Sequence, residues 1–163
     1  MRVGLGYDVH RLVTDEQLIL GGVKIDYHLG LAGHSDADVL VHSIMDALLG
    51  AVGSRDIGKH FPDDDPKYEG ISSLELLQEV IKLLEDKEFK LNNLDTIIIA
   101  QKPKLVTYIN QMEKNIAKIL KVNLNKINIK ATTTEKLGFI GQEKGIAAKA
   151  IVSLKKVGGY KSC

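Results

Sequence analysis

The chain has 163 residues, a formal net charge of +1 at pH 7 and 26% charged residues. This length is typical of one domain with a substantial core, and a nucleic-acid-binding domain would usually have a strong basic excess. The only cysteine, Cys163, is the last residue, which excludes a disulfide framework and a cysteine metal cluster. No apolar run approaches the roughly 20 residues of a membrane span, and the first residues lack the layout of a signal peptide. We therefore expect a cytoplasmic protein that binds neither nucleic acid nor membrane.

The hydrophobic pattern of the first half predicts a strand, a hairpin and a helix. Residues 2–10 read as a strand, and residues 18–25 read as a hairpin around two consecutive glycines. Ser35 or Asp36 is placed to cap a helix that runs to about Gly50. This helix is apolar on nearly every side, which predicts that it is buried. A polar stretch with two prolines and three consecutive aspartates follows and reads as a loop.

The second half is predicted to contain two more helices and three strands. Ser72 and Glu75 have the spacing of a capping box at the start of an amphipathic helix. Residues 95–101 form a nearly continuous apolar run, typical of a strand covered on both faces. The remaining predicted elements are a helix after Pro103, a strand over residues 126–134, a glycine-rich loop, and a last strand in which residues 146–154 alternate with a period of two. The pattern predicts one α+β domain over residues 1–157 and a flexible tail at residues 158–163.

Four clusters of polar residues stand out because a fold alone does not need them. The clusters are Asp8 with His10, residues 34–38 with His42, residues 56–58 with residues 61–65, and residues 132–135 with Gly138 and Phe139. Because the side chains of a strand alternate between its faces, the first pair projects from one side. The question is what a carboxylate and an imidazole do together at the end of a strand.

His42 lies in an otherwise apolar helix and needs a partner there, since burying an unpaired polar group costs about 1–3 kcal/mol. One interpretation is a core histidine hydrogen-bonded to a carboxylate. The other is a metal ligand that acts with Asp8 and His10, because three protein ligands and an open position are typical of catalytic zinc. Asp46, one turn beyond His42, either orients the imidazole or is a surface carboxylate.

The acidic loop and the threonines also have two interpretations each. The three consecutive aspartates form either a solvated turn or a site for a metal ion or sugar hydroxyls. The threonines at 132–134 reflect either β-propensity or a phosphate site in which Glu135 holds a hard cation. The glycine spacing in GFIGQEKG matches neither the P-loop nor the dinucleotide fingerprint, which disfavours a P-loop kinase.

Five motifs together closely resemble those of the 2-C-methyl-D-erythritol 2,4-cyclodiphosphate synthase family. In order, they are GYDVHRL, GHSDADVLVH, DIGKHFPDDDP, IIIAQKPK and KATTTEKLGFIG, and the resemblance extends from about Arg2 to the last strand. It implies a homotrimer of α+β subunits, each a sheet with helices packed on one side, with active sites between subunits. It also implies a lyase of the non-mevalonate isoprenoid pathway, in which the 2-phosphate of 4-diphosphocytidyl-2-C-methyl-D-erythritol 2-phosphate attacks its own β-phosphate and CMP leaves.

The resemblance implies two kinds of metal ion. Asp8, His10 and His42 are similar to the family's Zn²⁺ ligands, and Glu135 is similar to the residue that holds Mg²⁺ or Mn²⁺ between the α- and β-phosphates. Many family members have an arginine that faces an anion in a cavity on the trimer axis, where this chain has Gln142. Gln142 has no charge, so the resemblance does not extend to the binding of isoprenoid diphosphates in that cavity.

The resemblance also implies a substrate site for a small cytidine diphosphate derivative, contributed partly by a neighbouring subunit. His34 and Thr133 correspond to residues that stabilise the transition state. The implied substrate-binding residues are Asp8, Val9, His10, His34, Ser35, Asp56, Ile57, Gly58, Phe61, Pro62, Asp63, Asp64, Asp65, Ala100, Gln101, Lys102, Pro103, Lys104, Leu105, Val106, Thr132, Thr133, Thr134, Glu135, Phe139 and Gln142.

Two other functions are compatible with the ligand set. One is a zinc-dependent phosphohydrolase that acts on a nucleotide diphosphate, whose products would contain oxygen from solvent. The other is a trimeric module that binds cytidine nucleotides or a metal without turnover. The presence of His34, Thr133 and Glu135 argues against such a module, which would have little use for all three.

Overall fold

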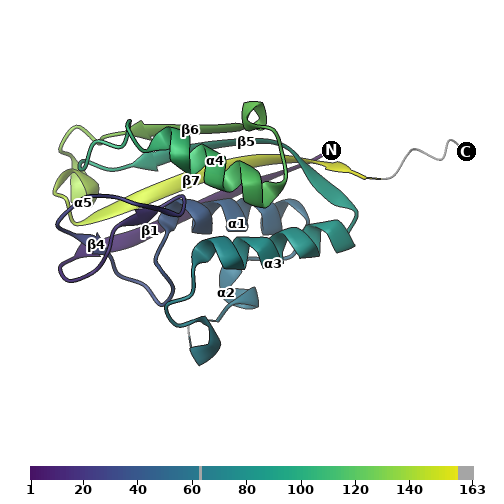
Figure 1. Cartoon of the computed structure of the whole chain (residues 1–163), viewed down its shortest axis with the longest axis horizontal. Helices are drawn as coiled ribbons and strands as arrows, with labels where there is room; N and C mark the ends of the chain where they lie inside the picture. The colour runs from purple at the N-terminus through teal and green to yellow at the C-terminus, as the bar shows by residue number, and fades with distance from the viewer. Residues whose placement is uncertain (63, 158–163) are drawn as a thin grey trace, which may run out of the picture.

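The computed structural model describes residues 1–62 and 64–157 as a mixed sheet covered by helices (Figure 1). The sheet has five strands in the order β4-β1-β7-β5-β6, and β2 and β3 form a separate two-stranded hairpin. The elements are β1 (Arg2–Val13), β2 (Ile19–Leu20), β3 (Val23–Lys24), β4 (Gly30–Leu31), α1 (Val39–Ala51), α2 (Ile57–His60), the 3₁₀ turn η1 (Pro66–Tyr68), α3 (Ser73–Asp86), β5 (Phe89–Ile99), α4 (Ile109–Leu120), the 3₁₀ turn η2 (Leu124–Lys126), β6 (Ile127–Thr132), α5 (Gly138–Gly141) and β7 (Gly145–Lys156).

Helices α1, α3 and α4 lie on one side of the sheet, which confirms the predicted α+β architecture (Figure 1). None of the helices in the described residues combines the length and apolar character that crossing a bilayer requires. The predicted tail at residues 158–163 and Asp63 lie outside the described residues.

Strand β7 is the centre of the sheet. It pairs antiparallel with β1 from Gly145 to Leu154 and antiparallel with β5 on its other side, and β5 in turn pairs parallel with β6. Side chains at alternate positions of β7, such as Ile146, Ala148 and Val152, are buried, so the predicted last strand is confirmed. In β5, Ile98 is buried whereas Ile99 on the other face is only half-buried, so the prediction that both faces are covered is wrong for the single chain.

Helix α1 lies directly on β1 because two glycines face it from the strand. A Cβ atom on Gly4 would lie 1.9 Å from the carbonyl oxygen of Ala47, and one on Gly6 would lie 1.9 Å from that of Ser43. No side chain fits in that space, so helix and strand approach each other closely. The helix itself is buried nearly all round, as its apolar sequence predicts.

The cap of α1 differs from the prediction. Asp38, and neither Ser35 nor Asp36, is the N-cap, and its Oδ1 accepts the N–H of Val41 at 3.1 Å. Its Oδ2 accepts the N–H of Gly22 at 2.7 Å, which ties the β2–β3 hairpin to the start of the helix. Three candidates for the cap lie within four residues of this sequence, and the additional hydrogen bond to the distant hairpin favours the third, Asp38.

Short helices replace parts of two predicted loops. The polar stretch after α1 contains α2 and η1, and the glycine-rich loop before β7 contains α5. Each is four residues or fewer. An element this short makes only about one helical turn, so hydrophobic periodicity cannot predict it. The starts of α2 and η1 are instead marked by their N-caps, Asp56 and Asp65.

The contact between Gly6 and α1 predicts a large steric effect of one methyl group. Gly6→Ala should lower the free energy of unfolding by about 1–3 kcal/mol or more, because the new atom overlaps helix backbone that cannot rotate away. Gly50→Ala, in α1 but with open space at its Cβ, should raise it by a few tenths to about 1 kcal/mol. Urea unfolding of the metal-free proteins at one protein concentration measures both, and a Gly6→Ala variant as stable as wild type would contradict this packing.

The buried carboxyl of Asp38 predicts a dependence of stability on pH. Burial raises its pKa from 3.8 to about 6; the charge of Asp36 adds to the rise, while the N–H groups of Gly22, Gly21 and Val41 oppose it. The folded state therefore holds this proton at pH values where the unfolded state has lost it, so the group's contribution to stability falls as the pH rises through that interval.

Between about pH 4 and pH 7, the free energy of unfolding of the metal-free wild type should fall by about 2 kcal/mol more than that of Asp38→Asn. Urea unfolding at several pH values measures the difference between the two proteins. The variant serves as the control, because every other titrating group is common to both. Parallel pH profiles would show that Asp38 ionises normally in the fold.

Candidate metal centre and active site

Asp8, His10 and His42 form a group whose candidate ligand atoms all lie within 4.8 Å of one another. The first two continue the side of β1 that carries the helix-facing glycines, and α1 places His42 above them. The Nδ1 atoms of His10 and His42 lie 3.0 and 3.1 Å from the same oxygen, Asp8 Oδ2. Buried His10 Nδ1 makes no hydrogen bond with suitable geometry in the described part of the chain. Two ring nitrogens that converge on one carboxylate oxygen, one of them unpaired, fit a bound divalent cation.

The charges in this group favour a cation. Burial alone would raise the pKa of Asp8, but its close contacts and charge interactions with the imidazoles of His10 and His42 hold it well below its usual range. Burial alone would lower the pKa of His42, but Asp8 outweighs this effect and raises it. Asp8 is therefore an anion at neutral pH. A metal must displace a proton from His42, so metal binding should weaken as the pH falls.

The contacts of His42 decide between its two interpretations. The carboxylate that it contacts is Asp8, which is itself a candidate ligand, so the geometry favours the metal site. Asp46 does not contact the ring: it accepts the N–H of Ile57 at 2.8 Å and so fixes the start of α2. Burial raises the pKa of Asp46, an effect that this N–H partly offsets. The hypothesis that Asp46 orients His42 is wrong; Ser73, which the sequence did not reveal, contacts the far side of the ring.

The three residues lie in the wall of a hollow of about 410 Å³. Its lining consists of Asp8, Val9, His10, Arg11, Ala32, Gly33, His34, Ser35, His42, Met45, Ile57, Gly58, Phe61, Tyr68 and Leu76. Eight of the implied substrate-binding residues are therefore brought together with the metal group. The lining residues that were missed are mostly apolar, and nothing in the sequence distinguishes them from ordinary core residues.

The acidic loop at residues 61–65 borders this hollow in part. His34 Nε2 lies 3.1 Å from the carbonyl oxygen of Asp65, to which it can donate. The carboxylates of Asp56 and Asp65 accept backbone N–H groups at their own helix starts, as turn-forming aspartates do. Pro62 and Asp64 are not in the wall of the hollow, and Asp63 lies outside the described residues.

Eight further implied residues gather at the carboxyl ends of β5 and β6, where they line a separate hollow of about 320 Å³. Its lining is Ala100, Gln101, Pro103, Lys104, Leu105, Val106, Ala131, Thr132 and Thr133. Lys102 instead pairs with Glu143 at 3.1 Å. Strand β7 lies between β1 and β5 in the sheet, so within a single chain this hollow is separated from the metal group.

Thr134, Glu135, Phe139 and Gln142 also lie outside both hollows. The Thr133 hydroxyl donates to Glu135 Oε1 at 2.8 Å, whereas the Thr134 hydroxyl donates to the carbonyl of Leu137. Phe139 lines a third hollow together with Val9 and His10. Gln142 is the C-cap of α5 and lines none of these hollows.

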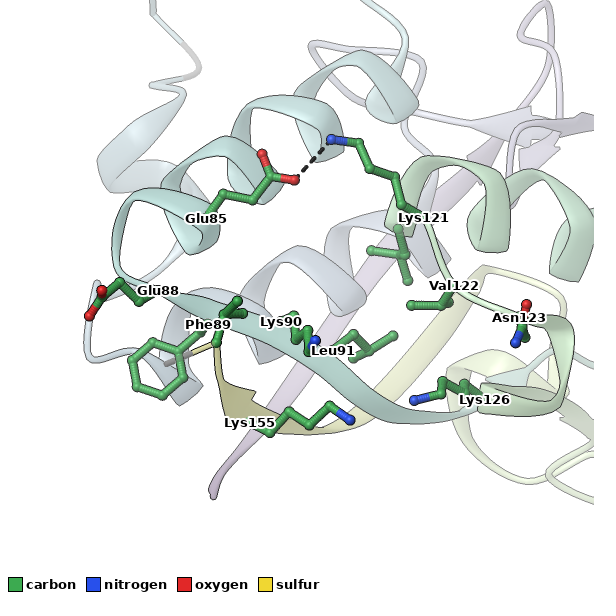
Figure 2. Close-up of a pocket in the computed structure, with 12 residues that line it drawn as sticks. Glu85, Glu88, Phe89, Lys90, Leu91, Lys121, Val122, Asn123, Lys126 and Lys155 are labelled. Atoms are coloured by element: carbon green, nitrogen blue, oxygen red, sulfur yellow. Dashed lines mark hydrogen bonds and ion pairs between the residues drawn. The ribbon is translucent and has the colours of Figure 1, made fainter. Parts of the chain in front are cut away.

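A fourth hollow, of about 600 Å³, lies between the ends of α3 and α4 and the start of β5 (Figure 2). Its rim carries Lys90, Lys121, Lys126 and Lys155, and Lys121 is paired with Glu85 at 2.9 Å. It is larger than the hollow beside His42, but its lining contains no histidine and no convergent set of ligands. The donor chemistry, and not the volume, identifies the candidate active site.

Comparison with known proteins agrees with this geometry. The model described as "YgbB family" matches residues 1–155. A Lachnospira eligens protein named 2-C-methyl-D-erythritol 2,4-cyclodiphosphate synthase is 59% identical over 160 residues, which cover 98% of this chain and 87% of that protein.

Two solved structures share the fold. The bifunctional IspDF from Campylobacter jejuni has a TM-score of 0.92 and 45% identity, covering 95% of this chain but only 42% of that longer chain. An IspF from Plasmodium falciparum in a CDP complex has a TM-score of 0.84 and 38% identity, covering 96% of this chain and 97% of that one. The resemblance of the five motifs is thereby confirmed, and the chain belongs to the YgbB family of 2-C-methyl-D-erythritol 2,4-cyclodiphosphate synthases.

Proposed function

We propose that this chain converts 4-diphosphocytidyl-2-C-methyl-D-erythritol 2-phosphate into 2-C-methyl-D-erythritol 2,4-cyclodiphosphate and CMP. An oxygen of the 2-phosphate bonds to the β-phosphorus, and the bond from that phosphorus to the oxygen bridging to the α-phosphate breaks, so CMP leaves with the bridging oxygen. The observation that carries the proposal is the convergence of Asp8, His10 and His42 beside His34 in one hollow, in a chain of this family.

The metal group fits a Zn²⁺ ion, with Asp8 as the anionic ligand and the two Nδ1 atoms as neutral ligands. Such an ion would neutralise phosphate oxygens and increase the electrophilicity of the phosphorus. Glu135 is proposed to hold Mg²⁺ or Mn²⁺ at the diphosphate, since hard carboxylate oxygens suit these ions. The hydroxyl of Thr133, 2.8 Å from Glu135 Oε1, fixes the direction in which that carboxylate points.

The side chains of the site position the reactants and do not need to remove a proton. The attacking phosphate is already ionised near neutral pH, so what the protein must supply is charge stabilisation and alignment. His34, held by the carbonyl of Asp65, is proposed to stabilise the charge that moves onto phosphate oxygens. Thr133 would share this role if its hydroxyl proton turned from Glu135 to a phosphate oxygen when a cation occupies that carboxylate. Phe61, Tyr68 and Leu76 give the hollow an apolar wall that keeps out water, which would otherwise compete at phosphorus.

We further propose that three copies of the chain form the working enzyme. The side of β1 that faces away from the helices carries Val3, Leu5, Tyr7 and Val9, which are between 40% and 68% exposed, and Ile151 of β7 adjoins them. Monomeric proteins rarely leave so continuous an apolar strip in water. Packing of this face against two other copies would cover it. It would also allow the hollow at Ala100–Val106 of one chain to serve the cytidine end of a substrate bound at the metal group of another.

The proposal is tested by following the purified protein with the substrate and Mg²⁺ by phosphorus NMR. A cyclic diphosphate that forms in step with CMP supports it. Linear products that contain oxygen from labelled water would instead identify the zinc phosphohydrolase, which the ligand set also permits. Tight binding of cytidine nucleotides without any product would identify a binding module. Sedimentation of the same sample tests for an assembly of three chains.

The ligand assignment predicts that removing His42 removes the metal. His42→Ala should lose most of its zinc and its activity together, because the two remaining ligands leave the ion mostly to solvent. Elemental analysis after dialysis against a weak chelator measures the zinc content. His28→Ala, at an exposed position outside the group, is the matched control and should keep its zinc. Full zinc content in His42→Ala would refute the assignment.

A further inference from the structure

His42 is held from behind by polar side chains of α3 and of the segment that precedes α1. Its Nδ1 faces Asp8, while its Nε2 points the other way and lies 2.9 Å from the Oγ of Ser73 and 3.1 Å from the Oγ of Ser35. Ser73 is the first residue of α3 and is fully buried. Bulk water therefore does not replace its contact with the imidazole.

Asp36 fixes the direction of the Ser73 hydroxyl. Its Oδ1 accepts a short hydrogen bond from Ser73 Oγ, and its Oδ2 accepts the N–H of the same residue at 3.0 Å. An ionised carboxylate has only acceptors, so the hydroxyl proton must point toward Asp36. The lone pairs of Ser73 Oγ then remain to face His42, and Ser73 acts on that ring as an acceptor.

An acceptor at Ser73 requires the imidazole proton to lie on Nε2, and in neutral His42 this leaves the lone pair on Nδ1. That lone pair points at Asp8 Oδ2, 3.1 Å away, so a proton or a metal ion has to lie between the two atoms. We infer that Asp36 and Ser73 are positioning residues that select the metal-binding tautomer of His42 and fix the plane of its ring. The inference deepens the proposed function, since it rests on Asp8, His10 and His42 being the metal ligands.

The sequence supplies a matched control one residue away. Ser72 is the N-cap of α3, and its Oγ accepts the N–H of Leu74 at 3.3 Å without touching His42. Losing this cap should lower the melting temperature, as replacing an N-cap serine by alanine usually does. Comparing Ser72→Ala with Ser73→Ala therefore distinguishes an effect on the stability of α3 from an effect on the imidazole of His42.

The test compares Ser73→Ala, Asp36→Asn and Ser72→Ala with the wild type. In Asp36→Asn the amide can donate to Ser73 Oγ, which turns the hydroxyl proton toward His42 and favours the wrong tautomer. Zinc affinity of the metal-free proteins is measured by competition with a chromophoric chelator, and the visible spectrum of the Co²⁺-loaded proteins reports the ligand geometry. Thermal unfolding without metal checks that each variant is folded.

We expect Ser73→Ala and Asp36→Asn to bind zinc about 10- to 100-fold more weakly and to show an altered Co²⁺ spectrum. Ser72→Ala should keep its zinc affinity and spectrum while melting at a lower temperature. Unchanged zinc affinity and Co²⁺ spectrum in both Ser73→Ala and Asp36→Asn would overturn the inference. So would a loss of zinc affinity that is equally large in Ser72→Ala. A wild type that binds zinc but yields no cyclic product would count against the proposed function and leave this inference intact.

Discussion

The close contact between β1 and α1 is the constraint on which the rest of the site depends. Gly4 and Gly6 bring the helix backbone down onto the strand, and the same side of the strand then continues with Asp8 and His10. Because the gap is set by backbone and not by side chains, His42 reaches Asp8 Oδ2 at 3.1 Å from a helix that cannot move away without losing its packing. The metal group is thus preorganised by the core and not by a loop.

Three aspartates around α1 perform three different tasks, although the sequence shows them only as carboxylates. Asp38 caps the helix and ties the β2–β3 hairpin to it. Asp46 holds the start of α2 through the N–H of Ile57, and Asp36 holds Ser73 at the start of α3. The segments that surround the hollow are therefore all anchored near one buried helix. Disturbing α1 should disturb the loop, the hairpin and the metal group together.

The sequence predicts the elements whose hydrophobic pattern repeats over several turns or strand positions. It does not predict a cap or a side-chain role that depends on one hydrogen bond to a residue far away in the sequence. The period of two in β7 and the apolar character of α1 are properties of many residues, so both predictions are confirmed. The cap at Asp38 depends on Gly22, and the role of Ser73 depends on His42, which is 31 positions away. A serine beside a capping box carries no signal that it also faces an imidazole.

Strand β1 links the metal group to the proposed assembly through its period of two. Its even-numbered positions from Gly4 to His10 face α1 and carry the glycines and the ligands, while its odd-numbered positions from Val3 to Val9 form the exposed apolar strip. A shift of one residue in the register with β7 would turn the ligands to the outside and the apolar residues against the helix. One strand register therefore sets both the metal group and the face proposed to join three subunits. This explains why hydrophobic and ligand-forming residues alternate from Tyr7 to His10 within the stretch GYDVHRL.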